Sequence, residues 1–336
     1  MTSRELVKKT LEFANTNRVP RQLWHLKWAE IHYERELRKI LEDFPADIIE
    51  CPEFLTVDFE REDLTKVGTS KDDWGCIFEN KQHGIVGEVK IPIVKGEEWE
   101  DFENVHIPIE LLEVDTDRVN EYCKNSDKFI LSPCLARPFE QLQFIRSTEA
   151  LYVDIALKSE GMLKFLKKMH SFYCQLIEKW AQTDVDGILF MDDWGSQKSL
   201  LINPKTWVEI FKPLYKDYID IAHKYGKKVF MHSDGYTIDI IPHLIELGLD
   251  AMNVQIFCIG VENLQQFAGK LTFWGEIDRQ HILPYGSEDD VKQAVSLVKK
   301  NLWKNGGCIA QCEFGIGAKP DNIYEVFNSW NNIAEL

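Results

Sequence analysis

Gly187-Ile-Leu-Phe-Met-Asp192 is the first of five short apolar runs in the second half of the chain, and such runs tend to end in polar residues. The others span residues 228–232, 250–254, 271–275 and 307–311. Short, nearly continuous apolar runs are typical of parallel strands that are buried on both faces. The sequence therefore predicts repeated strand–helix units.

The segments between these runs carry residues that typically start and end helices. Asn203-Pro204 supplies an N-cap and a first-turn proline, and Gly226 ends the apolar positions of helical period that follow. Ser287 and Asp290 resemble a capping box at the start of a helix that ends near Gly306.

The first half of the chain is less regular. Helices are expected at residues 4–17 and 28–43, and strands at 18–24, 46–50 and 128–132. Residues 73–78 and 84–90 read as an antiparallel hairpin, inserted within residues 54–98 after the second strand. About eight strands result, so we expect an α/β fold: a (β/α)8 TIM barrel with an N-terminal helical extension and an inserted β-hairpin. One domain would span residues 1–336.

Composition narrows the class of protein. The chain has 336 residues, a formal charge of −16 and 44% hydrophobic residues, which excludes a disordered chain and argues against nucleic-acid binding. No apolar run approaches the roughly 18 residues of a membrane span. The N-terminus has no apolar core of a signal peptide, and the eight cysteines form no CxxC pair. We expect a cytoplasmic protein with reduced thiols.

In a TIM barrel the residues at the C-terminal ends of the strands form the active site. His232-Ser-Asp234 follows one such strand, and the side chains of residues two apart in extended backbone point the same way. Cys312 ends the last strand and Glu276 follows the one before it. Histidine, cysteine and carboxylate suit zinc, so His232, Asp234, Glu276 and Cys312 are the candidate ligands. The alternative is a polar His–Asp pair at the rim and a buried, inert thiol.

Asp192 and Asp193 are the candidate catalytic residues. Adjacent residues of a strand face opposite sides, so only one of them would enter the barrel, where it would bind substrate or act as a general base. The alternative is that one caps the next segment. Five further residues at strand ends are candidates for substrate binding: Arg137, Trp194, Asn253, Gln255 and Trp274. Either tryptophan could instead fill the core.

The sequence resembles the uroporphyrinogen decarboxylase-like superfamily, most clearly over residues 126–330. The resemblance is carried by Asp186-Gly-Ile-Leu-Phe-Met-Asp-Asp193, Asn203-Pro204, Phe211-Lys-Pro213, His232-Ser-Asp-Gly235, Trp274-Gly-Glu-Ile-Asp278 and Cys312 with Pro320-Asp-Asn-Ile323. It implies a (β/α)8 barrel. The superfamily contains decarboxylases of uroporphyrinogen and corrinoid-linked methyltransferases that use zinc.

Two departures separate these branches. Decarboxylases carry an Arg-Gln-Ala-Gly-Arg-like segment whose arginines pair with the substrate's acidic arms, but here only Arg21-Gln22 remains of it. Methyltransferases of the superfamily carry His-x-Cys and a later Cys. His232 matches the histidine and Cys312 the later cysteine, whereas Asp234 replaces the middle cysteine. With an aspartate in place of a cysteine, the ligand set of the zinc ion is harder, and such a zinc ion suits the polarisation of an oxygen or nitrogen leaving group.

The resemblance therefore implies a zinc-dependent methyltransferase of the O-demethylase type. It would move a methyl group from a methyl ether (an aryl ether among them), methylamine or thioether to the cobalt of a corrinoid protein. The chain lacks the Asp-x-His-x-x-Gly pattern of cobalamin modules, so a partner would supply the corrinoid. The alternatives are uroporphyrinogen decarboxylase, a methylcorrinoid-to-acceptor methyltransferase and a non-catalytic tetrapyrrole-binding barrel. Neither nucleic acid nor membrane is expected as a partner, and a homodimer is left open.

Overall fold

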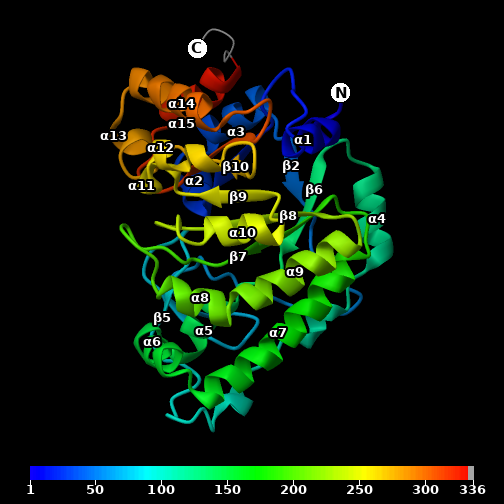
Figure 1. Cartoon of the computed structure of the whole chain (residues 1–336), viewed down its shortest axis with the longest axis vertical. Coiled ribbons are helices and arrows are strands. Elements are labelled where there is room, and N and C mark those ends of the chain that lie inside the picture. Colours follow the sequence, from blue (N-terminus) through cyan, green and yellow to red (C-terminus); the bar gives the residue numbers. More distant parts are fainter. Residues whose placement is uncertain (332–336) are drawn as a thin grey trace.

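The computed structural model of the chain describes residues 1–331. Its main sheet has eight parallel strands in the order β1-β11-β10-β9-β8-β7-β6-β2 (Figure 1). They are β1 (Arg21–His25), β2 (Ile48–Glu50), β6 (Phe129–Cys134), β7 (Gly187–Met191), β8 (Lys228–Ser233), β9 (Ala251–Val254), β10 (Thr272–Trp274) and β11 (Cys308–Phe314). The Asp47 N–H donates to the Arg21 carbonyl over 2.8 Å and joins the two end strands. The sheet is thus a nearly closed barrel, which confirms the predicted fold class.

The helices form the outer layer. They are α2 (Lys27–His32), α3 (Glu34–Asp43), α4 (Thr116–Lys124), α5 (Pro138–Arg146), α6 (Thr148–Leu157), α7 (Glu160–Ala181), α8 (Pro204–Ile210), α9 (Lys212–Lys224), α10 (Ile241–Leu247), α11 (Ile256–Ile259), α12 (Val261–Leu264), α13 (Ile282–Tyr285), α14 (Glu288–Leu302) and α15 (Pro320–Asn331), with 3-10 turns at Phe102–Asn104, Ile109–Leu112 and Gln265–Phe267. Within residues 1–331, no helix is long and apolar enough to cross a membrane.

Two of the predicted helix starts are confirmed, whereas two of the predicted helices are each divided into two. Asn203 caps α8, and Ser287 with Asp290 forms the capping box of α14. The helix predicted from Asn203 onward is divided at Phe211, because Pro213 lacks an N–H and cannot continue α8. The helix predicted for residues 28–43 is broken at Tyr33, whose φ is −139°.

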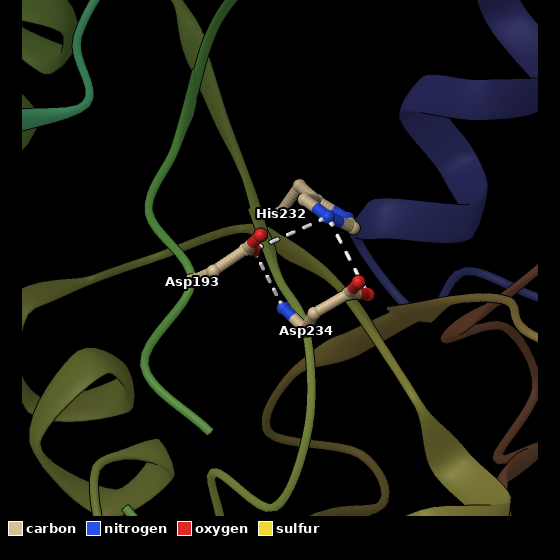
Figure 2. Close-up of side chains that lie close together, drawn as sticks. All are labelled: Asp193, His232 and Asp234. Atoms are coloured by element: carbon tan, nitrogen blue, oxygen red, sulfur yellow. Dashed lines mark hydrogen bonds and ion pairs between the residues drawn. The ribbon is translucent and has the colours of Figure 1, made fainter. Parts of the chain in front are cut away.

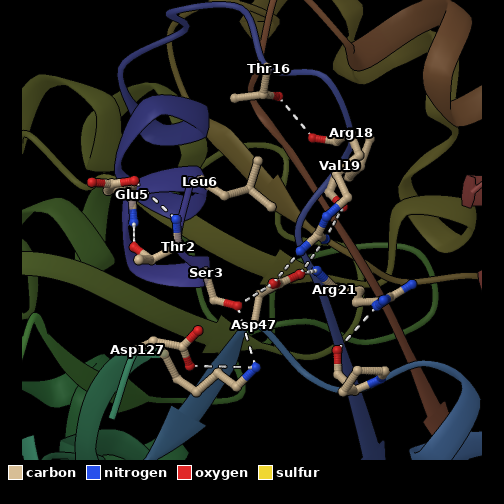
Figure 3. A network of polar contacts seen from close by, with 12 residues as sticks. Thr2, Ser3, Glu5, Leu6, Thr16, Arg18, Val19, Arg21, Asp47 and Asp127 are labelled. Carbon is tan, nitrogen blue, oxygen red and sulfur yellow. Dashed lines mark hydrogen bonds and ion pairs between the residues drawn. The ribbon is translucent and has the colours of Figure 1, made fainter.

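Helix α1 (Ser3–Leu11) closes the end of the barrel at which the strands begin. It is shorter than the predicted helix over residues 4–17, since Phe13 and Asn15 take left-handed backbone conformations. The Asp47 carboxylate, 1% exposed, accepts hydrogen bonds from the Ser3 hydroxyl and from the Arg18 guanidinium (Figure 3). These contacts fix α1 to the start of β2.

The insert after β2 is a three-stranded antiparallel sheet of β3 (Gly68–Lys71), β4 (Ile77–Asn80) and β5 (Glu88–Val89). A two-stranded hairpin was expected there, with its first strand at residues 73–78. The Asp72 carboxylate accepts hydrogen bonds from the N–H groups of Trp74 and Cys76, which folds this stretch into a turn. The strand therefore begins only at Ile77, and β3 adds a third strand.

Alternate residues of each strand face the barrel interior and the surrounding helices. On β8, Phe230 packs inside the barrel, whereas Val229 and Met231 belong to the core between sheet and helices. On β11, Ile309 lies inside and Cys312 belongs to the outer core. This alternation decides which polar side chains reach the barrel mouth.

Candidate metal centre

Three side chains from the ends of two neighbouring strands converge at the barrel mouth. His232 is the last inward-facing residue of β8, Asp234 follows it by two positions, and Asp193 follows β7 (Figure 2). The His232 Nε2 lies 3.5 Å from the Asp193 Oδ1 and 3.6 Å from the Asp234 Oδ1. One ligand atom of each residue lies within 4.8 Å of the other two, close enough for all three to bind one metal ion.

Asn253 on β9 fixes the orientation of the His232 ring. Its amide nitrogen donates to the carbonyl of Trp274, so its Oδ1 faces the His232 Nδ1 at 2.7 Å and accepts a hydrogen bond from it. This bond keeps the proton of a neutral imidazole on Nδ1 and leaves the Nε2 lone pair facing the two aspartates. Metal-binding histidines are oriented in this way by their second nitrogen.

The group fits a cation by charge as well as by direction. Burial lowers the pKa of His232, but the charges of Asp193, Asp234 and Glu276 together with the hydrogen bond to Asn253 outweigh burial, so the pKa is raised. The Asp234 Oδ1 is buried and has no hydrogen-bond partner among residues 1–331. A buried carboxylate oxygen without a donor is costly, and a metal ion at this position would satisfy it.

On the opposite side of the mouth, one arginine of the chain faces three carboxylates. Arg279 pairs with the second oxygen of Asp234, lies 3.6 Å from the Glu276 Oε1 and lies 3.3 Å from the Glu313 Oε2. Glu276 is 3% exposed, and burial raises its pKa to about 8 although Arg279 opposes the shift. Glu276 therefore lies at the mouth beside an arginine, outside the group of three.

Cys312 faces away from the mouth. It pairs with Leu23 of β1 in register, and both side chains belong to the core between sheet and helices. Its neighbour Glu313 points inward and reaches Arg279. The structure thus does not bring Cys312 together with His232. The even-numbered side chains of β11 face the helices, and Cys312 is one of them.

The two candidate catalytic aspartates have opposite environments. Asp192 is fully buried and accepts hydrogen bonds from the backbone N–H groups of Phe139 and Glu140 and from the Tyr215 hydroxyl. It caps the start of α5 from outside the barrel. Burial raises its pKa to about 8 against these three donors. Asp193, whose side chain is 38% exposed, enters the mouth, as the alternation of the strand requires.

The residues expected to bind substrate are distributed between core and mouth. Trp194 stacks on Phe139 in the outer core, and Trp274 fills the barrel interior, where its indole donates to Gln22. The Asn253 side chain forms the hydrogen bond that orients the His232 ring. Gln255 accepts a hydrogen bond from Gly235, which holds the loop after β8. Arg137 follows β6 and lines a cavity beside the mouth.

The sequence analysis did not include two residues among the metal ligands or the mouth. Asp193 was expected in catalysis and lies in the candidate metal group, and Arg279, which contacts that group, was not predicted. Arg279 directly follows the Trp274–Asp278 motif, yet a lone arginine after a strand carries no signal of the acids it meets. Only the folded loop brings it to Asp234 and Glu313.

Comparison with known proteins places the chain in a family. Residues 99–332 match the sequence profile of uroporphyrinogen decarboxylase (URO-D). The chain belongs to the URO-D family. No curated protein matches it by sequence.

A solved structure shares its fold. A methyltransferase from Methanosarcina mazei aligns with a TM-score of 0.67 and 14% identity over 99% of each chain. An intracellular xylanase from Thermoanaerobacterium saccharolyticum aligns with a TM-score of 0.41 and 9% identity, over 89% of this chain and 86% of the xylanase.

Proposed function

We propose that this URO-D family protein is a metal-dependent methyltransferase, which moves a methyl group from a small methylated donor to the cobalt of a corrinoid held by a partner protein. One observation carries the proposal: the hydrogen bond of the His232 Nδ1 to Asn253 places the other ring nitrogen, Nε2, 3.5 Å from the Asp193 carboxylate and 3.6 Å from the Asp234 carboxylate. The likeness in fold to the Methanosarcina methyltransferase supports it.

His232, Asp193 and Asp234 would hold the metal ion, for which we propose zinc. An imidazole nitrogen suits zinc, while two carboxylates make the set harder than a thiolate site. Bound there, zinc would act as a Lewis acid toward the heteroatom that carries the methyl group. Glu276 and Cys312 could bind the same metal ion only if their side chains turned toward His232, since neither belongs to the group of three in this structure.

Residues of the chain would orient the methyl donor and keep water away from it. Arg279 holds the outer oxygen of Asp234 and keeps its inner oxygen turned toward His232. Asn253 holds the ring, and the apolar barrel interior below, with Trp24 and Trp274, excludes water from that side. A corrinoid held by the partner would supply a cobalt(I) nucleophile that takes the methyl group and becomes cobalt(III), and the electron pair of the broken carbon–heteroatom bond would stay on the heteroatom.

Two observations disfavour decarboxylation of uroporphyrinogen. Arg21, the remnant of the arginine segment of decarboxylases, starts β1 at the closed end of the barrel, and its guanidinium donates to the Pro45 carbonyl. The mouth itself carries the carboxylates of Asp193, Asp234 and Glu313, which would repel the acidic arms of that substrate.

The test is a methyl-transfer assay with zinc-loaded protein and free cob(I)alamin as acceptor, using a panel of methyl ethers, methylamines and thioethers. We expect methylcobalamin to form with at least one donor, and His232→Ala to abolish it while Cys312→Ala does not. Absence of methylcobalamin with every donor, together with metal-independent release of carbon dioxide from uroporphyrinogen, would establish the decarboxylase instead.

A further inference from the structure

Two cysteines lie together where the insert joins the barrel. Cys51 directly follows β2, at the point where the chain leaves the barrel, and Cys123 lies in the last turn of α4, where the chain returns to it. Both thiols are free, with Cys51 3% exposed and Cys123 2% exposed, and they hydrogen-bond to each other. The pair belongs to neither the barrel mouth nor the candidate metal group.

The backbone holds the two segments side by side. The Asp115 N–H donates to the Phe54 carbonyl over 2.9 Å, and Leu55 forms an antiparallel bridge with Val114. The rings of Phe54 and Tyr122 pack edge-on with their centroids 6.0 Å apart. We call residues 51–56 and 113–123 the neck of the insert. Contacts on both sides of the cysteine pair thus keep the neck closed in the reduced protein.

The hydrogen bond makes the two thiols chemically unequal. Cys51 donates it, which lowers the pKa of Cys123 although burial opposes this, and the same bond raises the pKa of Cys51. The Arg4 guanidinium, which donates to the Cys123 carbonyl over 3.0 Å, also favours the thiolate, whereas Asp186 and Asp184 oppose it. A thiolate beside a second thiol is the arrangement from which peroxides generate disulfides.

We propose that Cys51 and Cys123 form a reversible disulfide when the protein is exposed to a peroxide. The Cys123 sulfur attacks one peroxide oxygen, the O–O bond breaks, and a sulfenic acid and one water molecule result. The Cys51 sulfur then attacks the sulfenic sulfur and displaces a second water. The two thiols lose two electrons and two protons, and hydrogen peroxide is reduced to water. An added thiol reverses the step by exchange.

The disulfide would lock the neck covalently. It closes residues 51–123 into one loop that contains β3, β4 and β5. A cross-link of this kind restricts the unfolded chain, and the gain in stability grows with the length of the loop that it closes. The oxidised protein should therefore resist unfolding better than the reduced one, whether or not the metal group is occupied.

The test is treatment of the wild-type chain with stoichiometric hydrogen peroxide, alkylation of the remaining thiols in denaturant, and mass spectrometry of tryptic peptides. We expect two of the eight thiols to be lost, one pair of peptides to be joined through Cys51 and Cys123, and dithiothreitol to restore all eight. The melting temperature of the oxidised protein should lie several degrees above that of the reduced protein.

Serine variants separate the two roles. Cys51→Ser keeps a hydroxyl donor but cannot form the disulfide, so oxidation should stop at a sulfenic acid on Cys123, which dimedone traps. Cys123→Ser should leave Cys51 as a thiol. The matched control is Cys308→Ser, since Cys308 is a buried free thiol whose pKa is raised by burial alone. This variant should form the disulfide like the wild type.

The proposal is overturned if oxidised wild-type protein yields no peptide joined through Cys51 and Cys123. It is overturned as well if Cys123 of Cys51→Ser gains no more dimedone than Cys308 does. Should a serine variant not fold, the joined peptide of the wild type decides the question by itself.

Discussion

The two sides of the barrel mouth are both acidic, yet they are neutralised differently. At the ends of β7 and β8, Asp193 and Asp234 face the Nε2 of His232, the ring nitrogen that does not contact Asn253. At the ends of β10 and β11, Glu276 and Glu313 face Arg279, a cation that belongs to the chain. The first side directs its ligand atoms to one point, whereas the second faces a single guanidinium, which it shares with Asp234.

This difference shows that the identity of a residue does not make it a ligand. Glu276 and Asp234 have the same chemistry and both contact Arg279, but only Asp234 also keeps an oxygen beside the imidazole. What separates the two sides is the direction of the side chains and the presence of a built-in cation. The expected outcomes below test the two sides and the residues around them in turn.

The largest effect is expected for His232→Ala. Removing the nitrogen donor should reduce zinc from about one ion per chain to near none, and lower metal affinity by more than the roughly 10–100-fold typical of a lost outer-shell contact. Elemental analysis after dialysis against zinc measures this. His223→Ala, which removes an exposed histidine paired with Asp250, is the control and should retain the metal.

The adjacent aspartates should respond in opposite ways. Asp192→Asn weakens the acceptor of two backbone N–H groups and the Tyr215 hydroxyl, so we expect the free energy of unfolding to fall by about 1–3 kcal/mol with the metal retained. Asp193→Asn should change stability by only about 0.5 kcal/mol but lose most of the metal. Denaturant titration and metal analysis of both variants would refute the comparison if the two effects were exchanged.

Replacing Arg279 should expose the charge of the second side. Burial gives Glu276 a pKa of about 8, above that of an unfolded chain, so the folded protein holds a proton that the unfolded chain releases. Stability from this group is therefore present at low pH and lost as pH rises toward 8 and beyond. Arg279→Met removes the opposing cation and raises the pKa of Glu276 further.

The deficit in stability of Arg279→Met relative to the wild type should be larger near pH 9 than near pH 5, by about 1–3 kcal/mol. Unfolding by urea at both pH values measures the difference. A deficit that is equal at the two pH values would mean that Arg279 acts through packing or through Asp234 and Glu313, and the neutralisation of Glu276 would have to be abandoned.

The smallest effect is expected for Cys312→Ala. Because this thiol packs in the outer core beside Leu23, its loss should leave the zinc content unchanged and cost about 1 kcal/mol of stability through a small cavity. Loss of metal in a folded Cys312→Ala protein would place the thiol in the site after all.

The sequence predicted the fold where local pattern suffices. The apolar runs ending near Asp192 and His232, the Asn203 cap and the Ser287 capping box depend on neighbours in the chain, and all are found as expected. The pairing of His232 with Asp234 followed from their spacing of two. The extent of the insert was not predictable, because the Asp72 turn depends on hydrogen bonds that a hydrophobic pattern does not contain.

The membership of the site depended on register between distant strands. Cys312 and Glu313 are adjacent in sequence, and which of them faces inward is fixed by the pairing of β11 with β1. Arg279 could not be placed without the loop after β10. The adjacent pair Asp192–Asp193 was predicted to divide between two faces, but the sequence did not indicate which aspartate would enter the barrel.

Anomalous X-ray scattering from crystals of the zinc-loaded protein, recorded on both sides of the zinc absorption edge, tests the central claim most directly. We expect one peak, bounded by the His232 Nε2 and by carboxylate oxygens of Asp193 and Asp234. A peak beside the Cys312 sulfur, or no peak at the mouth of a fully loaded protein, would contradict the account.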